Sequence, residues 1–297
     1  MHVFVTGGSG LTGPTVVAEL IEAGHTVTGL ARSAAAATRL ESLGATPHRG
    51  SLDDLDSLSR GAEAADGVLH MAFGGDFADP DDMMRRDRTA IETLGRAVEG
   101  SGKPFVSTSG TLVMPAGRKS TEQDEPDTAG IAAFRIAGER ACLDFADRGV
   151  RASVVRLAPT VHGPRDHGFI GMLVDTARKT GKSAYVGDGG NRWPAVHRLD
   201  AAVLFRLALE EAPAGSVLHG AAENVRFRSI AETIARGLDL PAVSLTPEEA
   251  ATHYASPFMA IVYGFDAPVS STFTQDLLGW SPRHPSLLDD VVRGDYF

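Results

Sequence analysis

Short apolar runs and amphipathic stretches alternate through the first half of the chain. Runs rich in Val, Leu and Phe, typical of buried strands in a parallel sheet, occupy residues 2–6, 25–31, 67–73, 104–109 and 152–158. Stretches whose apolar residues recur at helical spacing occupy residues 11–24, 34–44, 82–100 and 131–148. This alternation predicts right-handed crossovers, and therefore an α/β fold of the Rossmann type with a doubly wound parallel sheet and helices on both faces.

The pattern changes after Leu157, where loops lengthen and polar and aromatic residues cluster. Two segments are especially dense in such residues, "VHGPRDHGF" and "YVGDGGNRWPAVHRLD". We therefore expect a first domain over residues 1–157 and a smaller, substrate-binding lobe over most of residues 158–297, with some later segments returning to the sheet. A cleft between the two parts is the expected place for a ligand.

Composition places the chain among ordinary globular proteins and narrows its partners. The 297 residues, 43% of them hydrophobic and 22% charged, can form a full core. A formal net charge of -10 and a pI near 5.4 argue against nucleic acid or an anionic membrane as partner, because both bind basic patches. The single cysteine, Cys142, excludes a disulfide within the chain and a cysteine-based metal cluster, and no metal site is expected. We see neither a secretory signal nor an apolar run of about 18 residues, so we expect a cytoplasmic protein.

The segment "HVFVTGGSGLTG" places three glycines at spacings of three directly after the first predicted strand. In a strand–loop–helix context, Gly7 permits the tight turn, Gly10 lets the backbone approach a pyrophosphate, and Gly13 lets the helix pack close to the strand. The helix that begins near Leu11 and Thr12 offers unpaired N–H groups and the positive end of its dipole to phosphate. The segment therefore predicts a dinucleotide-binding site.

This glycine segment resembles the motif of the short-chain dehydrogenase/reductase superfamily, in the spacing of its extended and atypical members, the NAD-dependent epimerase/dehydratase-like group. Later segments match in the same order. "VLHMAFGG" is similar to the stretch beside the cofactor's riboses, "FVSTSGTLVM" to the strand end with the catalytic serine, and "VVRLAPTVHGP" to an Arg-Pro-x-x-Val-Tyr-Gly-Pro stretch. The resemblance implies cofactor contacts at Met71, Ala72 and Phe73 and a catalytic role for Ser109. His162 stands where the family has tyrosine.

The residues after the second predicted strand indicate which dinucleotide is bound. In this fold a carboxylate there binds the ribose of NAD, whereas an arginine suits the 2′-phosphate of NADP. The chain has Arg32 and Ser33 at this place and no acidic residue, so it predicts NADP(H) rather than NAD(H). In "RGSLDD", Ser51 and Leu52 follow the third strand, where relatives often have an acidic residue that holds adenine.

The helical segment that should carry the family's Tyr-x-x-x-Lys pair lacks it. Phe134 stands at the expected place of tyrosine and Gly138 at that of lysine, and the registers Ile131–Arg135 and Arg135–Glu139 fail as well. The tyrosine normally supplies the proton when hydride transfer leaves charge on oxygen. Three explanations stay open: another group donates the proton, the reaction needs little acid help, or the chain binds nucleotide without catalysis.

For the first explanation, the candidate proton donors beside Ser109 fall in segments expected to line the cleft, and they are His162, His167, Tyr185 and His197. A histidine suits the task because its pKa lies near neutrality, and His162 and Tyr185 are the donors that we predict. The residues predicted to bind substrate are apolar, aromatic or imidazole side chains expected around the cleft: Phe73, Met114, Phe134, His162, His167, Tyr185 and Trp193.

These observations predict an oxidoreductase that uses NADP(H) to reduce a small organic carbonyl or imine, or catalyses the reverse oxidation. Two alternatives remain, namely epimerase or dehydratase chemistry on a sugar-like substrate with a tightly held cofactor, and a non-catalytic NADP(H) sensor. The resemblance further implies a homodimer that forms through the helices over residues 82–100 and 131–148.

Overall fold

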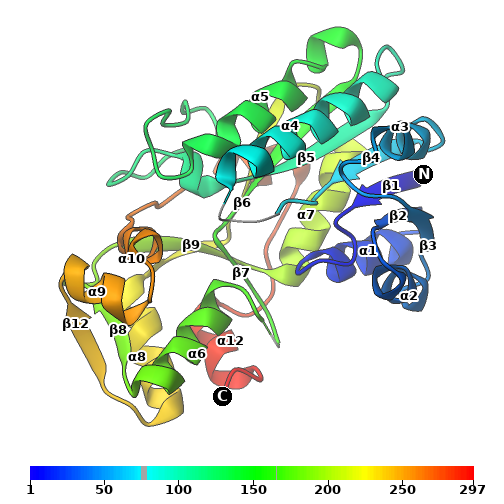
Figure 1. The fold of residues 1–297 in the computed structure, drawn as a ribbon. Helices are drawn as coiled ribbons and strands as arrows, with labels where there is room; N and C mark the ends of the chain where they lie inside the picture. The colour runs from blue at the N-terminus through cyan, green and yellow to red at the C-terminus, as the bar shows by residue number, and fades with distance from the viewer. Residues whose placement is uncertain (75–78, 165) are drawn as a thin grey trace.

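A seven-stranded parallel sheet forms the centre of the computed structural model, which describes residues 1–74, 79–164 and 166–297 (Figure 1). Its strands are β1 (His2–Thr6), β2 (Thr26–Ala31), β3 (Thr46–Arg49), β4 (Gly67–His70), β5 (Pro104–Gly110), β6 (Arg151–Leu157) and β10 (Ser216–Gly220). The order across the sheet is β10-β6-β5-β4-β1-β2-β3. The winding reverses between β1 and β4, and such switch points are where open α/β sheets bind ligands.

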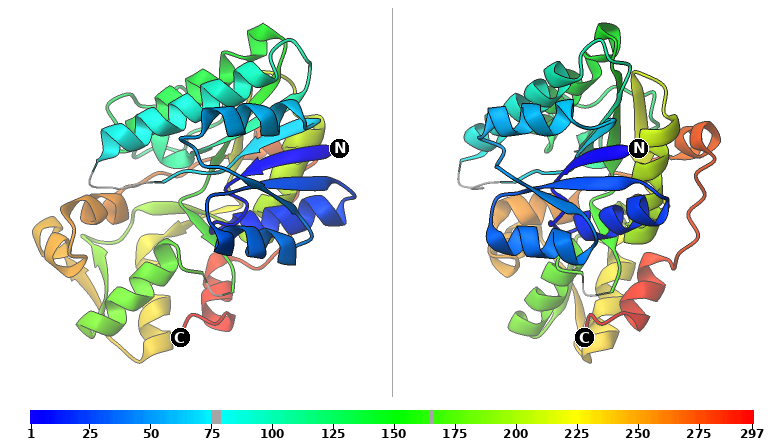
Figure 2. Two further views of the ribbon diagram at one scale, coloured as in Figure 1. Left: turned by 45° about the vertical axis from the view of Figure 1, so that its right-hand side comes forward. Right: turned by 90° about the vertical axis from the view of Figure 1, so that its right-hand side faces the viewer.

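Helices cover both faces of this sheet (Figure 2). Because strand side chains alternate, Phe4, Val68 and Phe105 lie in register on one face and Val5, Leu69 and Val106 on the other. The first face packs against α3 (Leu55–Glu63), α4 (Pro80–Ala97) and α5 (Ile136–Leu143), and the second against α1 (Gly13–Glu22), α2 (Ala34–Ser42) and α7 (Arg198–Glu211). The predicted doubly wound α/β fold is confirmed.

The predicted helix over residues 131–148 is wrong in its bounds. The structure divides it into a 3-10 turn η2 (Ala133–Arg135), α5, and a second 3-10 turn η3 (Ala146–Arg148). The Ala133 N–H donates to the Gly130 carbonyl and the Arg135 N–H to the Ala132 carbonyl. These bonds from residue i to residue i−3 wind the chain more tightly than an α-helix, so side chains before Ile136 project differently from a regular helix.

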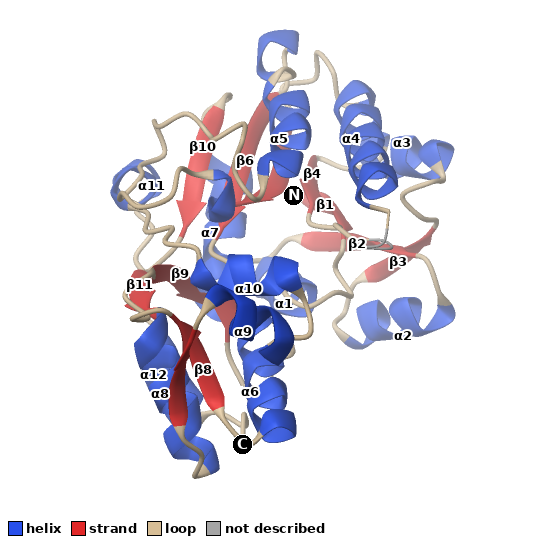
Figure 3. Ribbon diagram, turned by 60° about the vertical axis from the view of Figure 1, so that its left-hand side comes forward, coloured by secondary structure: helices blue, strands red, loops and turns tan. Residues whose placement is uncertain are grey.

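The remaining elements form a smaller lobe below the sheet (Figure 3). Its strands are β7 (Thr160–His162), β8 (Ser183–Val186), β9 (Arg192–His197), β11 (Glu223–Arg226) and β12 (Ala242–Leu245), and its helices are α6 (Phe169–Thr180), α8 (Phe227–Leu238), α9 (Pro247–His253), α10 (Pro257–Gly264) and α12 (Leu287–Arg293). The chain crosses between the two parts repeatedly, since α7 and β10 return to the large sheet and α11 (Thr272–Leu278) packs beside β10. In the described ranges, every helix is too short or too polar to traverse a bilayer.

Candidate cofactor and substrate site

A cavity of about 550 Å³ opens at the carboxyl ends of the strands on both sides of the switch point. The glycine loop after β1 forms one wall, and the segment after β4 forms another. Among the predicted cofactor residues, the cavity gathers Gly7, Gly10, Leu11, Thr12, Gly13, Arg32, Leu52, Met71, Ala72 and Phe73. Ser33 is not among the lining residues, because its Oγ caps α2 by accepting the Ala36 N–H at 3.2 Å.

The three loop glycines are required for different reasons. Gly7 has a φ of +77°, and a Cβ there would lie 2.6 Å from the Ala72 nitrogen. A Cβ on Gly13 would lie 2.2 Å from the Gly7 carbonyl oxygen, so only glycine lets α1 begin this close to β1. A Cβ on Gly10 would meet one atom of the chain, at 3.2 Å, and Gly10 is exposed toward the cavity. Contacts within the chain therefore explain Gly7 and Gly13. They do not explain Gly10, for which close approach of a pyrophosphate stays the prediction.

The first turn of α1 is prepared for an anion. Its N-cap, Thr12, makes no side-chain capping bond, Pro14 removes one N–H group, and no acidic residue occupies the turn. Free N–H groups and the positive end of the helix dipole therefore point toward the cavity that Thr12 and Gly13 line. This arrangement, with an exposed Gly10 beside it, fits the pyrophosphate of a dinucleotide.

Positive charge marks the other end of the cavity. Arg32 is exposed, lines the cavity, and forms no ion pair among the residues that the structure describes. The nearby Asp53 accepts both Arg86 Nε (2.7 Å) and Arg86 Nη2, so its charge is already compensated. The described walls contain no acidic residue. A guanidinium can pair with a phosphate, and the preference for NADP(H) stays a prediction.

A second cation, Arg135, packs against two residues of the cavity wall. Arg135 donates from Nη2 to the Thr108 carbonyl at 2.5 Å, and its guanidinium lies 3.5 Å from the centre of the Phe73 ring. Thr108 and Phe73 both line the cavity. Gly138 instead faces α4, since a Cβ there would lie 3.0 Å from Asp87 Oδ2. In the register Ile131–Arg135, Ile131 does not match the family's tyrosine, but Arg135 stands at the place of its lysine. A cation at that place was the sequence signal for this residue.

Strand alternation decides which hydroxyl at the end of β5 borders the cavity. Thr108 lines it and donates its hydroxyl to the His70 carbonyl at 3.0 Å. Ser109, one residue on, is buried in register with Arg156 of β6, and its Oγ has no hydrogen-bond partner in the described chain. The structure therefore places Thr108 at the cavity, and the catalytic role of Ser109 stays a prediction.

Three of the predicted substrate residues differ in their exposure to solvent. Phe134 is half-buried and stacks on Phe73 with ring centres 6.4 Å apart, and His167 is exposed. Met114 is buried and does not line the cavity, and its sulfur accepts Arg156 Nη1 at 3.2 Å.

Tyr185 and Trp193 lie outside the cavity walls. Trp193 is fully buried in the core of the smaller lobe, where its ring contacts Phe227 and Tyr263, and Tyr185 is buried in the same cluster. These rings bury apolar area on strands β8 and β9. This placement corrects the expectation that they line the cleft.

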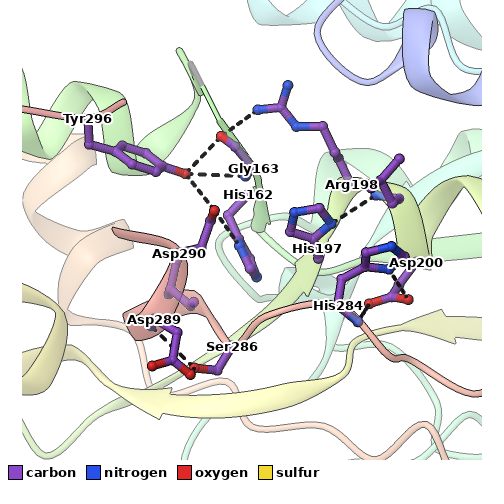
Figure 4. Close-up of polar contacts among 12 residues, drawn as sticks. His162, Gly163, His197, Arg198, Asp200, His284, Ser286, Asp289, Asp290 and Tyr296 are labelled. Carbon is purple, nitrogen blue, oxygen red and sulfur yellow. Dashed lines mark hydrogen bonds and ion pairs between the residues drawn. The ribbon is translucent and has the colours of Figure 1, made fainter. Parts of the chain in front are cut away.

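His162 lies in a buried polar network and is likewise absent from the cavity walls (Figure 4). Its Nδ1 is 2.9 Å from Asp290 Oδ2 in α12, and the Tyr296 hydroxyl lies 3.2 Å from the same carboxylate and 3.1 Å from the Gly163 carbonyl. Burial, the largest single effect, acts to raise the pKa of Asp290, but the hydrogen bond and charge of His162, the charge of His197 and the hydrogen bond from Tyr296 together outweigh it, so the pKa is lowered. The network ties the C-terminal segment to β7, and it does not support the predicted role of His162 as proton donor.

His197 makes this network sensitive to pH. Its Nδ1 accepts the Leu199 N–H at 3.2 Å and caps α7, while its ring stacks on His284 and meets His162 edge-on. Burial foremost, followed by the charge of His162, lowers the pKa of His197 to about 4. The unfolded chain, with an ordinary pKa near 6.5, binds the proton first as the pH falls.

We therefore expect the stabilisation that neutral His197 provides to be complete above pH 6.5 and to be lost as the pH falls toward 4. The shift corresponds to about 2–3 kcal/mol in the free energy of unfolding. His197→Asn keeps a capping oxygen but removes the titrating ring, so its urea-unfolding free energy should fall less over this range than that of the wild type. Parallel curves for the two proteins would contradict the assignment.

The doubly wound sheet, the glycine loop and the cavity at the switch point define a dinucleotide-binding α/β protein of the Rossmann type. The family model described as NAD dependent epimerase/dehydratase family matches residues 3–219, and the chain belongs to that family. This confirms the resemblance to extended short-chain dehydrogenases/reductases.

Relatives span several activities. The chain is 44% identical to an uncharacterized protein of Schizosaccharomyces pombe, over 100% of both chains. It is 29% identical to the 4-hydroxy-2-methyl-3-oxo-4-farnesyl-3,4-dihydroquinoline-1-oxide ketoreductase of Stigmatella aurantiaca, over 73% of this chain and 67% of the relative. Among solved structures, a dTDP-glucose 4,6-dehydratase from Streptomyces venezuelae with NAD bound is similar with a TM-score of 0.80 and 18% identity, over 99% of this chain and 95% of that one. This last likeness concerns the fold alone.

Proposed function

We propose that the protein is an NADP(H)-dependent oxidoreductase that reduces a small organic carbonyl or imine, or catalyses the reverse oxidation. The observation that carries the cofactor assignment is Arg32, an exposed cation at a cavity whose described walls contain no carboxylate. Membership of the family and the likeness to a ketoreductase support the reaction class. The described residues fit the cofactor on geometry, since the loop leaves Gly10 open and the first turn of α1 uncapped.

In this proposal each wall has one task. The backbone around Gly10 and the N-terminus of α1 hold the pyrophosphate, and Arg32 pairs with the 2′-phosphate. Met71, Ala72 and Phe73 line the path of the riboses toward Thr108. When bound, the cofactor would supply or accept a hydride at the inner end of the cavity.

Epimerase or dehydratase chemistry on a sugar-like substrate is the second candidate, and the name of the family favours it. Transient oxidation of a hydroxyl needs a base, and the chain has Ile131, Phe134 and Arg135 where tyrosine would supply it. A panel of ketones, aldehydes and imines tested for NADPH consumption separates the candidates. Good NADPH binding without any turnover would instead favour a sensor. Cytoplasmic location and a homodimer through α4 and α5 stay predictions from the sequence.

Charge reversal tests the cofactor assignment. Arg32→Glu should weaken NADPH binding by about tenfold or more, because a charge-assisted bond to phosphate is replaced by repulsion, and should change NADH binding much less. Arg39→Glu is the matched control, since Arg39 is equally exposed on α2 but does not line the cavity. Fluorescence titration of the wild type and both variants with both dinucleotides measures the six affinities. Equal losses for the two variants, or a wild-type preference for NADH, would refute the NADP(H) assignment.

A further inference from the structure

Arg135 lies against two residues of the cavity wall, Phe73 and Thr108, and part of its guanidinium has no partner. Nη2 donates to the Thr108 carbonyl, and the Phe73 ring covers a face of the group. A second nitrogen, Nη1, is buried and has no hydrogen-bond partner in the chain as described. A buried donor without an acceptor costs free energy, so an oxygen from a bound molecule would stabilise this arrangement.

The two carboxylates whose charges act on Arg135, Asp87 and Glu139, already have other partners. Asp87 Oδ1 lies 3.3 Å from His70 Nε2, and both oxygens of Glu139 accept bonds from Arg156. Burial lowers the pKa of Arg135, while Asp87 and Glu139 act in the opposite sense. A guanidinium stays protonated in proteins nevertheless, so Arg135 is a permanent positive charge held near apolar and aromatic groups.

We infer that Arg135 binds the oxygen of the substrate carbonyl and stabilises the negative charge that hydride transfer creates there. This inference rests on the proposed reductase function and assigns to Arg135 the electrostatic task that a tyrosine performs elsewhere. The described residues place Arg135 in contact with Phe73 and Thr108, both of which line the cavity. Donors fixed in advance in a site shielded from water stabilise such charge strongly.

The step balances without an acidic side chain. With NADPH bound, the cofactor would supply the hydride for a new C–H bond at the carbonyl carbon and would be left as NADP⁺. The electron pair of the C=O π bond would move to the substrate oxygen. Arg135 holds the resulting alkoxide by charge and hydrogen bonding, and the alkoxide then takes a proton from water. Because the guanidinium does not titrate, kcat should not fall through deprotonation of a general acid between about pH 6 and 10.

Matched glutamine variants separate this role from a general loss of charge. Arg135→Gln should lower kcat about 10²–10³-fold for whichever panel carbonyl the wild type reduces fastest, and change the Kd for NADPH less than about threefold. Arg140→Gln, on the exposed side of α5, should leave both quantities unchanged. In Arg135→Ala, guanidinium at low millimolar concentration should restore turnover, whereas urea at the same concentration should not. Circular dichroism and melting temperature show whether each variant is folded.

A binding measurement reads the same residue without turnover. Isobutyrate and isobutyramide have the same shape, but isobutyrate alone carries a charge like that of the alkoxide. Both the free protein and its complex with NADP⁺ should bind isobutyrate more tightly than isobutyramide, as judged by thermal shift. Arg135→Gln should abolish this preference and Arg140→Gln should retain it.

The outcomes distinguish failure of the role inferred for Arg135 from failure of the proposed reductase function. An Arg135→Gln variant that keeps both kcat and the isobutyrate preference overturns the inference and leaves the reductase proposal intact. A parallel loss of kcat and NADPH affinity that Arg135→Lys repairs would assign Arg135 to holding the cofactor, and would also overturn it. If the wild type binds neither dinucleotide, the proposed function fails, while the isobutyrate comparison on the free protein still decides whether Arg135 binds an anionic oxygen.

Discussion

Replacing Gly10 with aspartate is expected to weaken NADPH binding by at least about 100-fold, or about 2.7 kcal/mol, with little change in melting temperature. Gly10 is exposed, lies outside the left-handed region, and a Cβ there meets only the Gly7 carbonyl oxygen at 3.2 Å. The fold can therefore accept a side chain at this position after a small shift. The ligand cannot, because the new carboxylate would occupy the path of the pyrophosphate and repel its charge. Fluorescence titration with NADPH measures the loss.

Two further glycine variants act as controls for this prediction. Gly10→Ala adds the same Cβ without the charge and should lose much less affinity than Gly10→Asp. Gly13→Ala should instead lower the melting temperature, because its Cβ would lie 2.2 Å from the Gly7 oxygen, and the backbone would have to move. If Gly10→Asp bound NADPH as tightly as the wild type does, the assignment of the pyrophosphate to this loop would be wrong.

The Glu139→Gln substitution should lower the free energy of unfolding by about 3–5 kcal/mol. Glu139 of α5 and Arg156 of β6 form an ion pair whose side chains are each 3% exposed. Neutralising Glu139 leaves the Arg156 charge buried beside the sulfur of Met114, with water excluded. The loss arises from that uncompensated charge more than from the bond itself, so replacing both partners by Leu and Met should restore much of the stability.

A neighbouring helix offers the matched control. Glu92 of α4 pairs with Arg88 at 2.8 Å and Arg96 at 3.0 Å, but this cluster is open to solvent. Glu92→Gln should change the free energy of unfolding by less than about 1 kcal/mol. Urea unfolding of the two variants under the same conditions measures the difference. Similar losses for Glu92→Gln and Glu139→Gln would show that burial does not control the strength of these pairs.

The cofactor end of the site could be predicted from the sequence because its residues belong to short local motifs. A strand, a glycine loop and a helix follow one another within the first residues, and Arg32 follows the next strand directly. The carboxyl ends of neighbouring parallel strands meet at one edge, so these motifs converge once the sheet forms. Ser33 is not among the residues that line the cavity and its hydroxyl oxygen caps α2, a local role that this residue type favours, so its contact with the cofactor stays a prediction.

The catalytic end could not be predicted in the same way. Whether Thr108 or Ser109 borders the cavity depends on the phase of β5 in the sheet, and one residue of phase moves a side chain to the other face. Arg135, which contacts Phe73 and Thr108 of the cavity wall, belongs to the 3-10 turn η2 before α5, a detail that apolar periodicity does not report.

The sequence by itself determined the alternation of strands and helices, the glycine loop and the absence of the tyrosine–lysine pair, since each depends on residues close together in the chain. Only the tertiary structure decided that His162 is held by Asp290, 128 residues away, and that Tyr185 and Trp193 are enclosed in the smaller lobe. It also decided that Arg135 meets Phe73 and Thr108. Burial and pairing of this kind arise when distant segments pack together, so the pattern of any one segment contains no measure of them.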